Sequence, residues 1–160
     1  MNIIPSENLH KNKIINFFTT YWGSPKMVIS SGIFDCSALD GFAILNVEDQ
    51  IIGMITYVLN QNECEVISLD SLEEGKGIGS SLLQKVERTA AQHKCDRVKL
   101  ITTNDNLSAL KFYQKRGFQL VKIHKNAVQK ARELKPEIPL IGNDGIPLRD
   151  EIELEKVLKK

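Results

Sequence analysis

The sequence predicts an α/β protein built on a mixed sheet, and two observations carry that prediction. Strand-like runs in the first half are joined by short polar turns, and strands connected so tightly pair antiparallel. Further on, a glycine-rich loop and a helical pattern separate the strand-like run Glu63–Asp70 from the buried run Val98–Thr102. A strand–helix–strand crossover of this kind is right-handed and joins parallel strands. We therefore expect both kinds of pairing in one sheet.

The first half of the chain is typical of one helix followed by four strands. Apolar residues at helical spacing predict a helix that begins near Ser6 or Glu7 and stops at Gly23-Ser24-Pro25. The residues of this apolar stripe are Ile14, Phe17, Phe18 and Tyr21. The expected strands are Met27–Ile29, Phe42–Val47, Gln50–Leu59 and Glu63–Asp70.

The second half alternates helices and strands. A helical face is formed by Leu82, Leu83, Val86 and Ala90. Leu107–Arg116 reads as a helix that Gly117 closes as a left-handed cap, and Phe118–Ile123 as the next strand. We expect Asn126 to cap a short helix with Val128, Ala131 and Leu134 on one side. Arg149–Val157 alternates polar and apolar residues, as a half-buried strand does.

Length and composition fit one domain, residues 1–160, with residues 126–149 as an insertion before the last strand. The 160 residues are 42% hydrophobic and 26% charged, and the net charge is +1. Without blocks of like charge we expect no nucleic acid as partner. Without an apolar run of about 20 residues, or a signal sequence, we expect a cytoplasmic protein that does not enter membranes. A homodimer is the assembly to test.

The cysteines and histidines do not form a metal-binding pattern. The three cysteines, Cys36, Cys64 and Cys95, are widely spaced, which favours reduced thiols over a disulfide framework. Zinc sites are built from closely spaced ligand pairs, and neither the cysteines nor the three histidines supply them. We therefore expect no metal.

The loop Glu74–Ser80 has the composition of a phosphate-binding loop between a strand and a helix. Glycines allow backbone N–H groups to approach an anion, and the helix N-terminus adds donors and partial positive charge. A Walker loop requires Ser or Thr after its lysine, but Gly77 follows Lys76. A Rossmann fingerprint requires a glycine where Ser80 stands. A glycine-rich turn that binds nothing is the alternative for the loop taken alone.

Two motifs in order resemble the GNAT superfamily of acyl-CoA-dependent N-acyltransferases. The first is Gly77-x-Gly79 after a strand, and the second is Asn106-x-x-Ala109-x-x-x-Tyr113-x-Lys115-x-Gly117-Phe118. The resemblance implies a mixed sheet flanked by helices, with residues 63–118 as the acetyl-CoA-binding and catalytic core. It also implies that acetyl-CoA enters where the strand ending near Asp70 splays from Val98–Thr102.

The resemblance also implies which residues bind the cofactor. Backbone groups of Leu69 and Ser71 would pair with the pantetheine arm, and Asn106 would lie beside the cofactor. The pyrophosphate would be held by the glycine loop, that is by Gly75, Lys76, Gly77, Gly79 and Ser80. The family usually has Gln or Arg where Glu74 stands, so we expect this carboxylate to face solvent.

Glu65 is the candidate general base for the acceptor amine. Strict alternation along the strand places Glu63, Glu65, Ile67 and Leu69 on one face. Burial beside aliphatic residues would raise the pKa of Glu65 toward neutrality. A glutamate at about this place serves as base in some members of the family. Two solvated glutamates near a strand start, Glu63 as base, and a water chain remain as alternatives.

Tyr113 is the candidate acid that protonates the leaving thiolate. Asn106, Ala109 and Tyr113 are spaced i, i+3 and i+7, so they share one face of their helix. Reference pKa values of about 10 for tyrosine and about 8.5 for a thiol allow proton transfer to sulfur. The alternative is a core tyrosine whose hydroxyl is hydrogen-bonded.

The sequence thus predicts an N-acetyltransferase that moves an acetyl group from acetyl-CoA to a small-molecule or peptidyl amine. Two stretches of loop composition, Trp22–Gly41 and Lys135–Arg149, are expected to wall the acceptor pocket. The alternative from another class is a non-catalytic acyl-CoA-binding sensor or interaction domain, which needs neither Glu65 nor Tyr113. A third alternative is a site for another nucleotide phosphate such as ATP or NAD.

Overall fold

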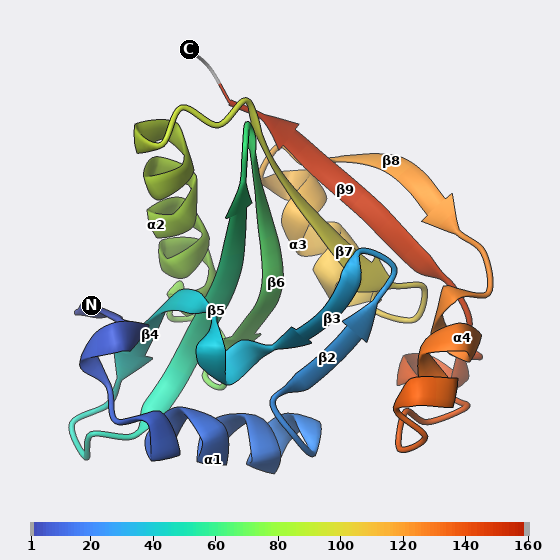
Figure 1. Cartoon of the computed structure of the whole chain (residues 1–160), viewed down its shortest axis with the longest axis horizontal. Helices are drawn as coiled ribbons and strands as arrows, with labels where there is room; N and C mark the ends of the chain where they lie inside the picture. The colour runs from blue at the N-terminus through green and yellow to red at the C-terminus, as the bar shows by residue number, and fades with distance from the viewer. Residues whose placement is uncertain (1, 159–160) are drawn as a thin grey trace. The chain divides into compact units, whose positions relative to one another are not determined.

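The computed structural model describes residues 2–158. Seven strands form one mixed sheet with one parallel pair, and β2 (Lys26–Ile29) and β3 (Gly32–Asp35) form a separate hairpin (Figure 1). In sheet order the seven strands are β1 (Ile3–Pro5), β4 (Asp40–Leu45), β5 (Ile51–Asn60), β6 (Glu63–Ser71), β7 (Arg97–Thr103), β9 (Glu151–Val157) and β8 (Gln119–His124). The mixed sheet expected from the sequence is confirmed.

The chain divides into two compact units. Unit 1 comprises residues 2–27, 34–98 and 158, and unit 2 comprises residues 28–33 and 99–157. Unit 1 contains helices α1 (Lys11–Trp22) and α2 (Ile78–Gln92), and unit 2 contains α3 (Leu107–Lys115) and α4 (Ala127–Leu134).

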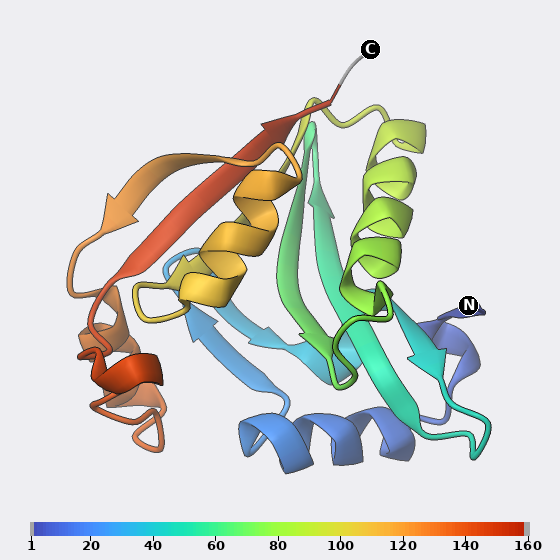
Figure 2. The same cartoon turned by 180° about the vertical axis from the view of Figure 1, so that it is seen from behind.

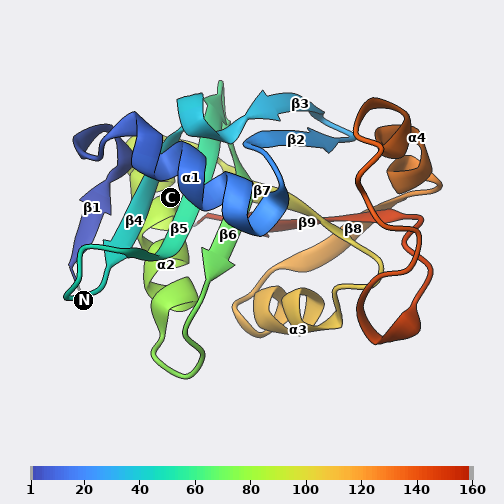
Figure 3. The same ribbon diagram turned by 90° about the horizontal axis from the view of Figure 1, so that it is seen from below.

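The core of unit 1 is the antiparallel sheet β1-β4-β5-β6 with a helix on each face. Helix α2 lies along β5 and β6 (Figure 2), and α1 and α2 lie on opposite faces of β4, β5 and β6 (Figure 3). Helix α1 buries Ile14, Phe17 and Phe18 of the predicted apolar stripe, whereas Tyr21 is 53% exposed. Helix α2 buries Ile78, Leu82, Leu83, Val86 and Ala90. Both stripes have the spacing that the sequence analysis used.

The start of α1 differs from the prediction. Residues Ser6–Asn8 form a separate 3₁₀ turn, and α1 begins only at Lys11. His10 is the N-cap, and its Nδ1 atom accepts a hydrogen bond of 3.2 Å from the backbone N–H of Asn12. A neutral imidazole nitrogen replaces the usual hydroxyl or carboxylate acceptor, which is why cap-residue preferences alone placed the start too early. The helix ends at Gly23 in the left-handed conformation, as expected.

Unit 2 is organised around the antiparallel pair β8–β9 and the turn between β7 and α3. The side chain of Asn104 in this turn bonds the backbone of the later loop, accepting from the N–H groups of Arg149 and Asp150 at 3.0 Å each. It also donates to the carbonyl of Pro147 at 2.9 Å. The neighbouring Asp105 accepts from the backbone N–H of Asn143 at 2.8 Å. These bonds fasten the loop before β9 to the β7–α3 turn.

The cap predicted for α4 is wrong. Asn126 occupies the N-cap position, but its φ is 61° and its side chain does not cap the helix. Instead its backbone N–H donates to the carboxylate of Asp150 at 2.8 Å. Asparagine tolerates the left-handed conformation, so this residue serves as a turn between β8 and α4. Strands β1 and β3 were not predicted, because they are three and four residues long and too short for a detectable alternation.

Candidate functional site

The glycine loop of unit 1 has the backbone conformation that an anion-binding loop requires. Gly75 and Gly77 have φ angles of 77° and 72°, in the left-handed region that favours glycine. Gly77 is the N-cap of α2, and no side chain caps that helix end. The first N–H groups of an α-helix have no intrahelical acceptor. The start of α2 therefore presents backbone donors and the positive end of the helix dipole, beside the exposed end of β6.

A third glycine, which the sequence analysis did not single out, sets the position of this helix end. A Cβ atom on Gly53 of β5 would lie 2.3 Å from Cγ2 of Ile78 and 3.2 Å from Cδ1 of Leu82. Ile78 is the first residue of α2, so the absence of a side chain at Gly53 allows the first turn to pack directly on the sheet. The signal for it was a glycine inside a strand, which marks a close backbone approach.

Charged residues of the loop pair with one another. The ammonium group of Lys76 contacts the carboxylate of Glu73 at 2.6 Å, and the side chain of Lys76 is 65% exposed. Lys76 is predicted to donate hydrogen bonds to a phosphate, and it could do so only if this surface ion pair opened. Opening costs little, because such pairs contribute less than about 1 kcal/mol to stability. Glu74 is exposed, as expected for a carboxylate beside a phosphate site.

A β-bulge in β6 changes which side chains share a face, and the alternation assumed for Glu65 is wrong. Val66 is opposite Tyr57, but Ser68 is opposite Thr56, so Ile67 is the extra residue. One extra residue moves every later side chain to the other face. Glu65, opposite Val58, therefore shares its face with Ser68 and Asp70 and not with Leu69. Leu69 and Ser71 face α2, because Ser71 is opposite Gly53, which packs against Ile78.

The face of the sheet toward α1 carries a buried polar cluster. The hydroxyl oxygens of Thr56 and Ser68 lie 2.6 Å apart, and both side chains are buried. The thiol of Cys36, which is 1% exposed, hydrogen-bonds with both hydroxyls. Burial raises the pKa of Cys36 to about 11 despite these hydrogen bonds. The thiol is therefore neutral near pH 7 and is not an activated nucleophile.

Asp70 lies on the same face, next to the end of β6. The indole Nε1–H of Trp22, the last residue of α1, donates to both carboxylate oxygens at 3.1 Å each. Burial raises the pKa of Asp70 to about 6, although the Trp22 hydrogen bond acts in the opposite direction. Asp70 was not among the predicted site residues, because strict alternation along β6 would separate it from Glu65.

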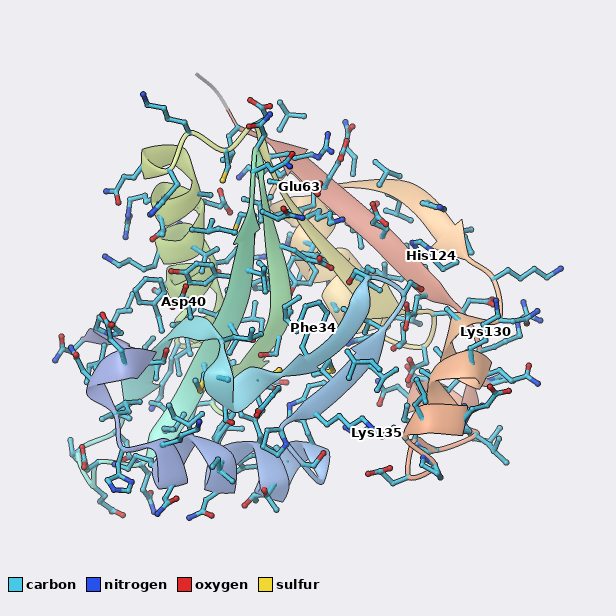
Figure 4. The ribbon with its side chains drawn as sticks, viewed as in Figure 1. Phe34, Asp40, Glu63, His124, Lys130 and Lys135 are labelled. Atoms are coloured by element: carbon cyan, nitrogen blue, oxygen red, sulfur yellow. The ribbon has the colours of Figure 1, made fainter. Side chains whose placement is uncertain are left out.

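Glu63 and Glu65 differ in their surroundings. Glu63 lies at the start of β6 (Figure 4) and forms an ion pair of 3.1 Å with the guanidinium of Arg97. A carboxylate held by a guanidinium is poorly placed to accept a proton. Glu65 lies two residues further along the strand, is half-buried, and is closer to the bulge.

The remaining predicted site residues, Asn106 and Tyr113, belong to α3 in unit 2. Asn106 caps the helix, its Oδ1 atom accepting from the N–H of Ala109 at 3.1 Å. The ligand role predicted for Asn106 would use the Nδ2 donors of the same amide. Tyr113 is 7% exposed and packs edge-on against Phe112 and Phe118, with centroid separations of 5.2 and 5.5 Å. These contacts hold the ring of Tyr113 in one orientation.

Unit 2 contains a cavity of about 410 Å³ between residues 28–33 and one face of α4. Its apolar wall includes Ile29, Ile33, Ala131 and Leu134, and its polar lining includes His124, Lys125 and Lys130. His124 and Lys130 are labelled in Figure 4, and the imidazole of His124 bonds Glu153 at 2.9 Å. Two stretches were expected to wall an acceptor pocket. The first, Trp22–Gly41, lines this cavity through residues 28–33. The second, Lys135–Arg149, is not in its lining, which comes instead from residues between His124 and Leu134.

Two further properties concern metal ions and membranes. Within residues 2–158 no group of three or more His, Cys, Asp or Glu side chains is arranged to hold a metal ion. In the same part of the chain, no helix combines the length and the apolar character needed to span a bilayer.

Comparisons with known proteins agree on one family. A model of the acetyltransferase (GNAT) family matches residues 12–118. The uncharacterized protein YdhI of Bacillus subtilis (strain 168) is 54% identical over 158 residues, a match covering 99% of this chain and 99% of the relative.

Solved structures show the same fold. An IAA acetyltransferase from Bacillus cereus ATCC 14579 has a TM-score of 0.69 at 22% identity, covering 98% of this chain and 100% of that one. A GNAT family acetyltransferase from Elizabethkingia anophelis with acetyl-CoA bound has a TM-score of 0.65 at 24% identity, covering 76% of this chain and 78% of that one.

Proposed function

Because the chain belongs to the acetyltransferase (GNAT) family, we propose that it transfers an acetyl group from acetyl-CoA to a primary amine, by direct attack in a ternary complex. The acceptor is a small-molecule or peptidyl amine, and the reaction takes place in the cytoplasm.

The observation that carries this proposal is the left-handed Gly75–Gly77 loop at the uncapped start of α2. A diphosphate needs several donors at short range without side chains in the way, and a Cβ atom on Gly75 would meet nothing within 4 Å. The donor set fits the diphosphate of coenzyme A. Gly75, Lys76, Gly77, Gly79 and Ser80 would hold it, Asn106 would lie beside the cofactor, and backbone groups of Leu69 and Ser71 would pair with the pantetheine arm.

The thioester of acetyl-CoA supplies the activated acetyl group. Glu65 accepts a proton from the acceptor nitrogen as the C–N bond forms, and the C–S bond then breaks. Tyr113 donates its hydroxyl proton to the departing sulfur and regains one from solvent. A neutral amine and acetyl-CoA thus yield an N-acetylamine and a free thiol.

Direct transfer is favoured over a covalent acetyl-enzyme because the cysteines are not activated. Burial raises the pKa of Cys36 to about 11 and that of Cys64 to about 12, and it also raises the pKa of Cys95. A thiol that stays protonated near pH 7 is a poor nucleophile. A steady-state analysis with both substrates varied should accordingly give intersecting lines, whereas parallel lines would indicate a covalent intermediate.

The proposal is tested by calorimetric titration with CoA, followed by acetyl-transfer assays on polyamines, amino acids, aminoglycosides and peptide N-termini. We expect saturable CoA binding and turnover with at least one class. Tyr113→Phe should lower kcat by about 10²-fold or more while CoA affinity changes little, since general acid catalysis contributes that much. Tyr21→Phe, a change at a 53% exposed tyrosine, is the control.

The outcomes separate the alternatives. CoA binding without turnover on the whole panel would favour the sensor or interaction domain. Competition of ATP or NAD with CoA would favour another nucleotide site. Glu65→Gln should flatten the rise of the rate with pH, and an unaltered profile would point to Glu63 or a water chain as the base.

A further inference from the structure

On the polar face of β6, the carboxylate of Asp70 has no cationic side chain as its partner among the described residues. Asp70 accepts hydrogen bonds from Trp22, but within residues 2–158 no Lys, Arg or His forms an ion pair with it. Some other carboxylates do have such partners, as Glu63 has Arg97 and Asp49 has Lys13. On the same face, Ser68 and Thr56 are uncharged hydroxyls, and the buried thiol of Cys36 lies near enough for the charge of Asp70 to raise its pKa.

The hydrogen bonds of Asp70 leave room for a second donor. One indole N–H is shared between both oxygens, whereas a carboxylate offers about four acceptor positions. Trp22 is 39% exposed and Asp70 is partly exposed, so both are accessible at the surface of unit 1. A cation beside Asp70 would also lie near the indole ring, whose face attracts positive charge.

We propose that Asp70, oriented by Trp22, binds an ammonium group of the acceptor other than the amine that is acetylated, so that the acceptor of this enzyme is an aliphatic or peptidyl amine that carries a second, cationic group. This inference rests on the proposed acetyl transfer. It gives Asp70 a role separate from that of Glu65, because the two residues lie five positions apart on one strand with a bulge between them. Because the bulge adds one residue, they are opposite Val58 and Met54, which are four positions apart on β5. At about 3.3 Å per position their Cα atoms are roughly 13 Å apart, too far to share one nitrogen.

The protonation of Asp70 is consistent with this role. Its pKa of about 6 leaves the carboxylate charged at neutral pH, when it would bind an ammonium ion. Below pH 6 the neutral carboxylic acid would no longer attract it. Binding of the amine should therefore weaken as the pH falls through 6.

The chain contains one tryptophan, so Trp22 is a built-in reporter for this site. The probe is n-butylamine, added to ¹⁵N-labelled protein that is saturated with CoA, and the readout is the indole N–H resonance. We expect a saturable shift of this resonance, whereas 1-butanol, the neutral analogue, should cause none. In Asp70→Asn the affinity should fall at least 10-fold, and in Asp49→Asn, which removes an exposed carboxylate, it should be unchanged.

Two results would overturn the inference: no saturable shift in the wild-type protein, or an equal response in Asp70→Asn. CoA titration of the same samples separates this failure from failure of the proposed function, since CoA binding does not depend on the amine. Asp70→Glu should restore part of the affinity, which a merely structural role for the carboxylate would not require. The pH titration of the indole resonance, with a midpoint near 6 that disappears in Asp70→Asn, shows that the reporter senses this group.

Discussion

Two strand-to-helix junctions, one in each unit, treat the unpaired N–H groups at the start of the helix differently. At the junction of β6 and α2 the N-cap is Gly77 and no side chain caps the helix. At the junction of β7 and α3 the side chain of Asn106 caps the helix, and Asn104 and Asp105 bond the loop before β9. The first junction leaves its backbone donors for a ligand, and the second uses side chains to satisfy the chain itself.

The comparison shows that the unpaired N–H groups at a helix start can serve either ligand binding or the stability of the fold. Both junctions follow a strand and begin an amphipathic helix. The difference lies in the residues before the first turn, glycines in one case and asparagine and aspartate in the other. Glycine can adopt the left-handed backbone and exposes amides, whereas Asn and Asp side chains accept hydrogen bonds from them. The effect of a substitution should therefore depend on the junction in which it is made.

The largest expected effect is that of Gly77→Asp at the binding junction. The aspartate would have to adopt a φ of 72° and would place a negative charge where the diphosphate is proposed to bind. CoA affinity, measured by calorimetry, should fall more than about 100-fold, which corresponds to about 2.7 kcal/mol. Gly145→Asp introduces the same residue at a φ of 73° in unit 2 and should leave CoA affinity unchanged. Tight CoA binding by Gly77→Asp would remove the loop from the proposed site.

The second effect should appear in stability and not in binding. Asn104→Ala deletes three side-chain hydrogen bonds to Pro147, Arg149 and Asp150 at the capped junction. At about 1 kcal/mol for each bond, the free energy of unfolding should fall by about 2–3 kcal/mol, measured by urea denaturation. Gln92→Ala, at an exposed position, serves as the control and should have little effect. If Asn104→Ala unfolds at the wild-type urea concentration, these bonds do not stabilise unit 2.

A smaller effect on binding is expected from Gly53→Ala, which changes the surface of β5 on which the first turn of α2 packs. The new methyl group would overlap Cγ2 of Ile78 and push the first turn of α2 away from the sheet. Overpacking of this kind costs about 1–3 kcal/mol, and we expect CoA affinity to fall about 10-fold. Adding Ile78→Ala should restore part of the affinity by removing the overlapping atom. An unchanged affinity in Gly53→Ala would show that the helix start tolerates displacement.

The smallest effect should come from Asn106, where the comparison can be sharpened. Asn106→Ala removes the cap and should destabilise the protein by about 1 kcal/mol. Asn106→Asp keeps an acceptor oxygen for the N–H of Ala109 but loses the Nδ2 donors. If Asn106 also contacts the cofactor, Asn106→Asp should keep wild-type stability and bind CoA about 3–10-fold more weakly. Equal CoA affinity in both variants and the wild type would restrict Asn106 to capping.

Much of unit 1 could be predicted because its signals are local. The apolar stripes of α1 and α2 and the alternation in β5 follow from periodicities within one element. The glycine loop was predicted because Gly75 and Gly77 are adjacent in sequence to the helix that they begin. The parallel crossover follows from chain handedness, which does not depend on the particular residues.

The composition of the polar face was not predictable in the same way. An extra residue at Ile67 reverses the face of Asp70 relative to Glu65, and nothing in the local pattern of β6 marks it. Trp22 and Asp70 are 48 residues apart, and Thr56 and Ser68 are 12 apart. Their hydrogen bonds depend on how α1 and the strands pack, which no window of the sequence contains.

The sequence by itself determined the helices and the strands other than the short β1 and β3, the glycine loop before α2, and the motifs that identify the family, since each of these depends on neighbouring residues. Only the tertiary structure decided which carboxylates share a face of β6 and which are neutralised by a cation. The physical reason is that side-chain direction in a strand reverses with every residue, so one bulge redistributes a whole face. Pairing of charges likewise depends on distance in space, and Glu63 and Arg97, which are 34 residues apart in the chain, meet only because β6 and β7 are packed together.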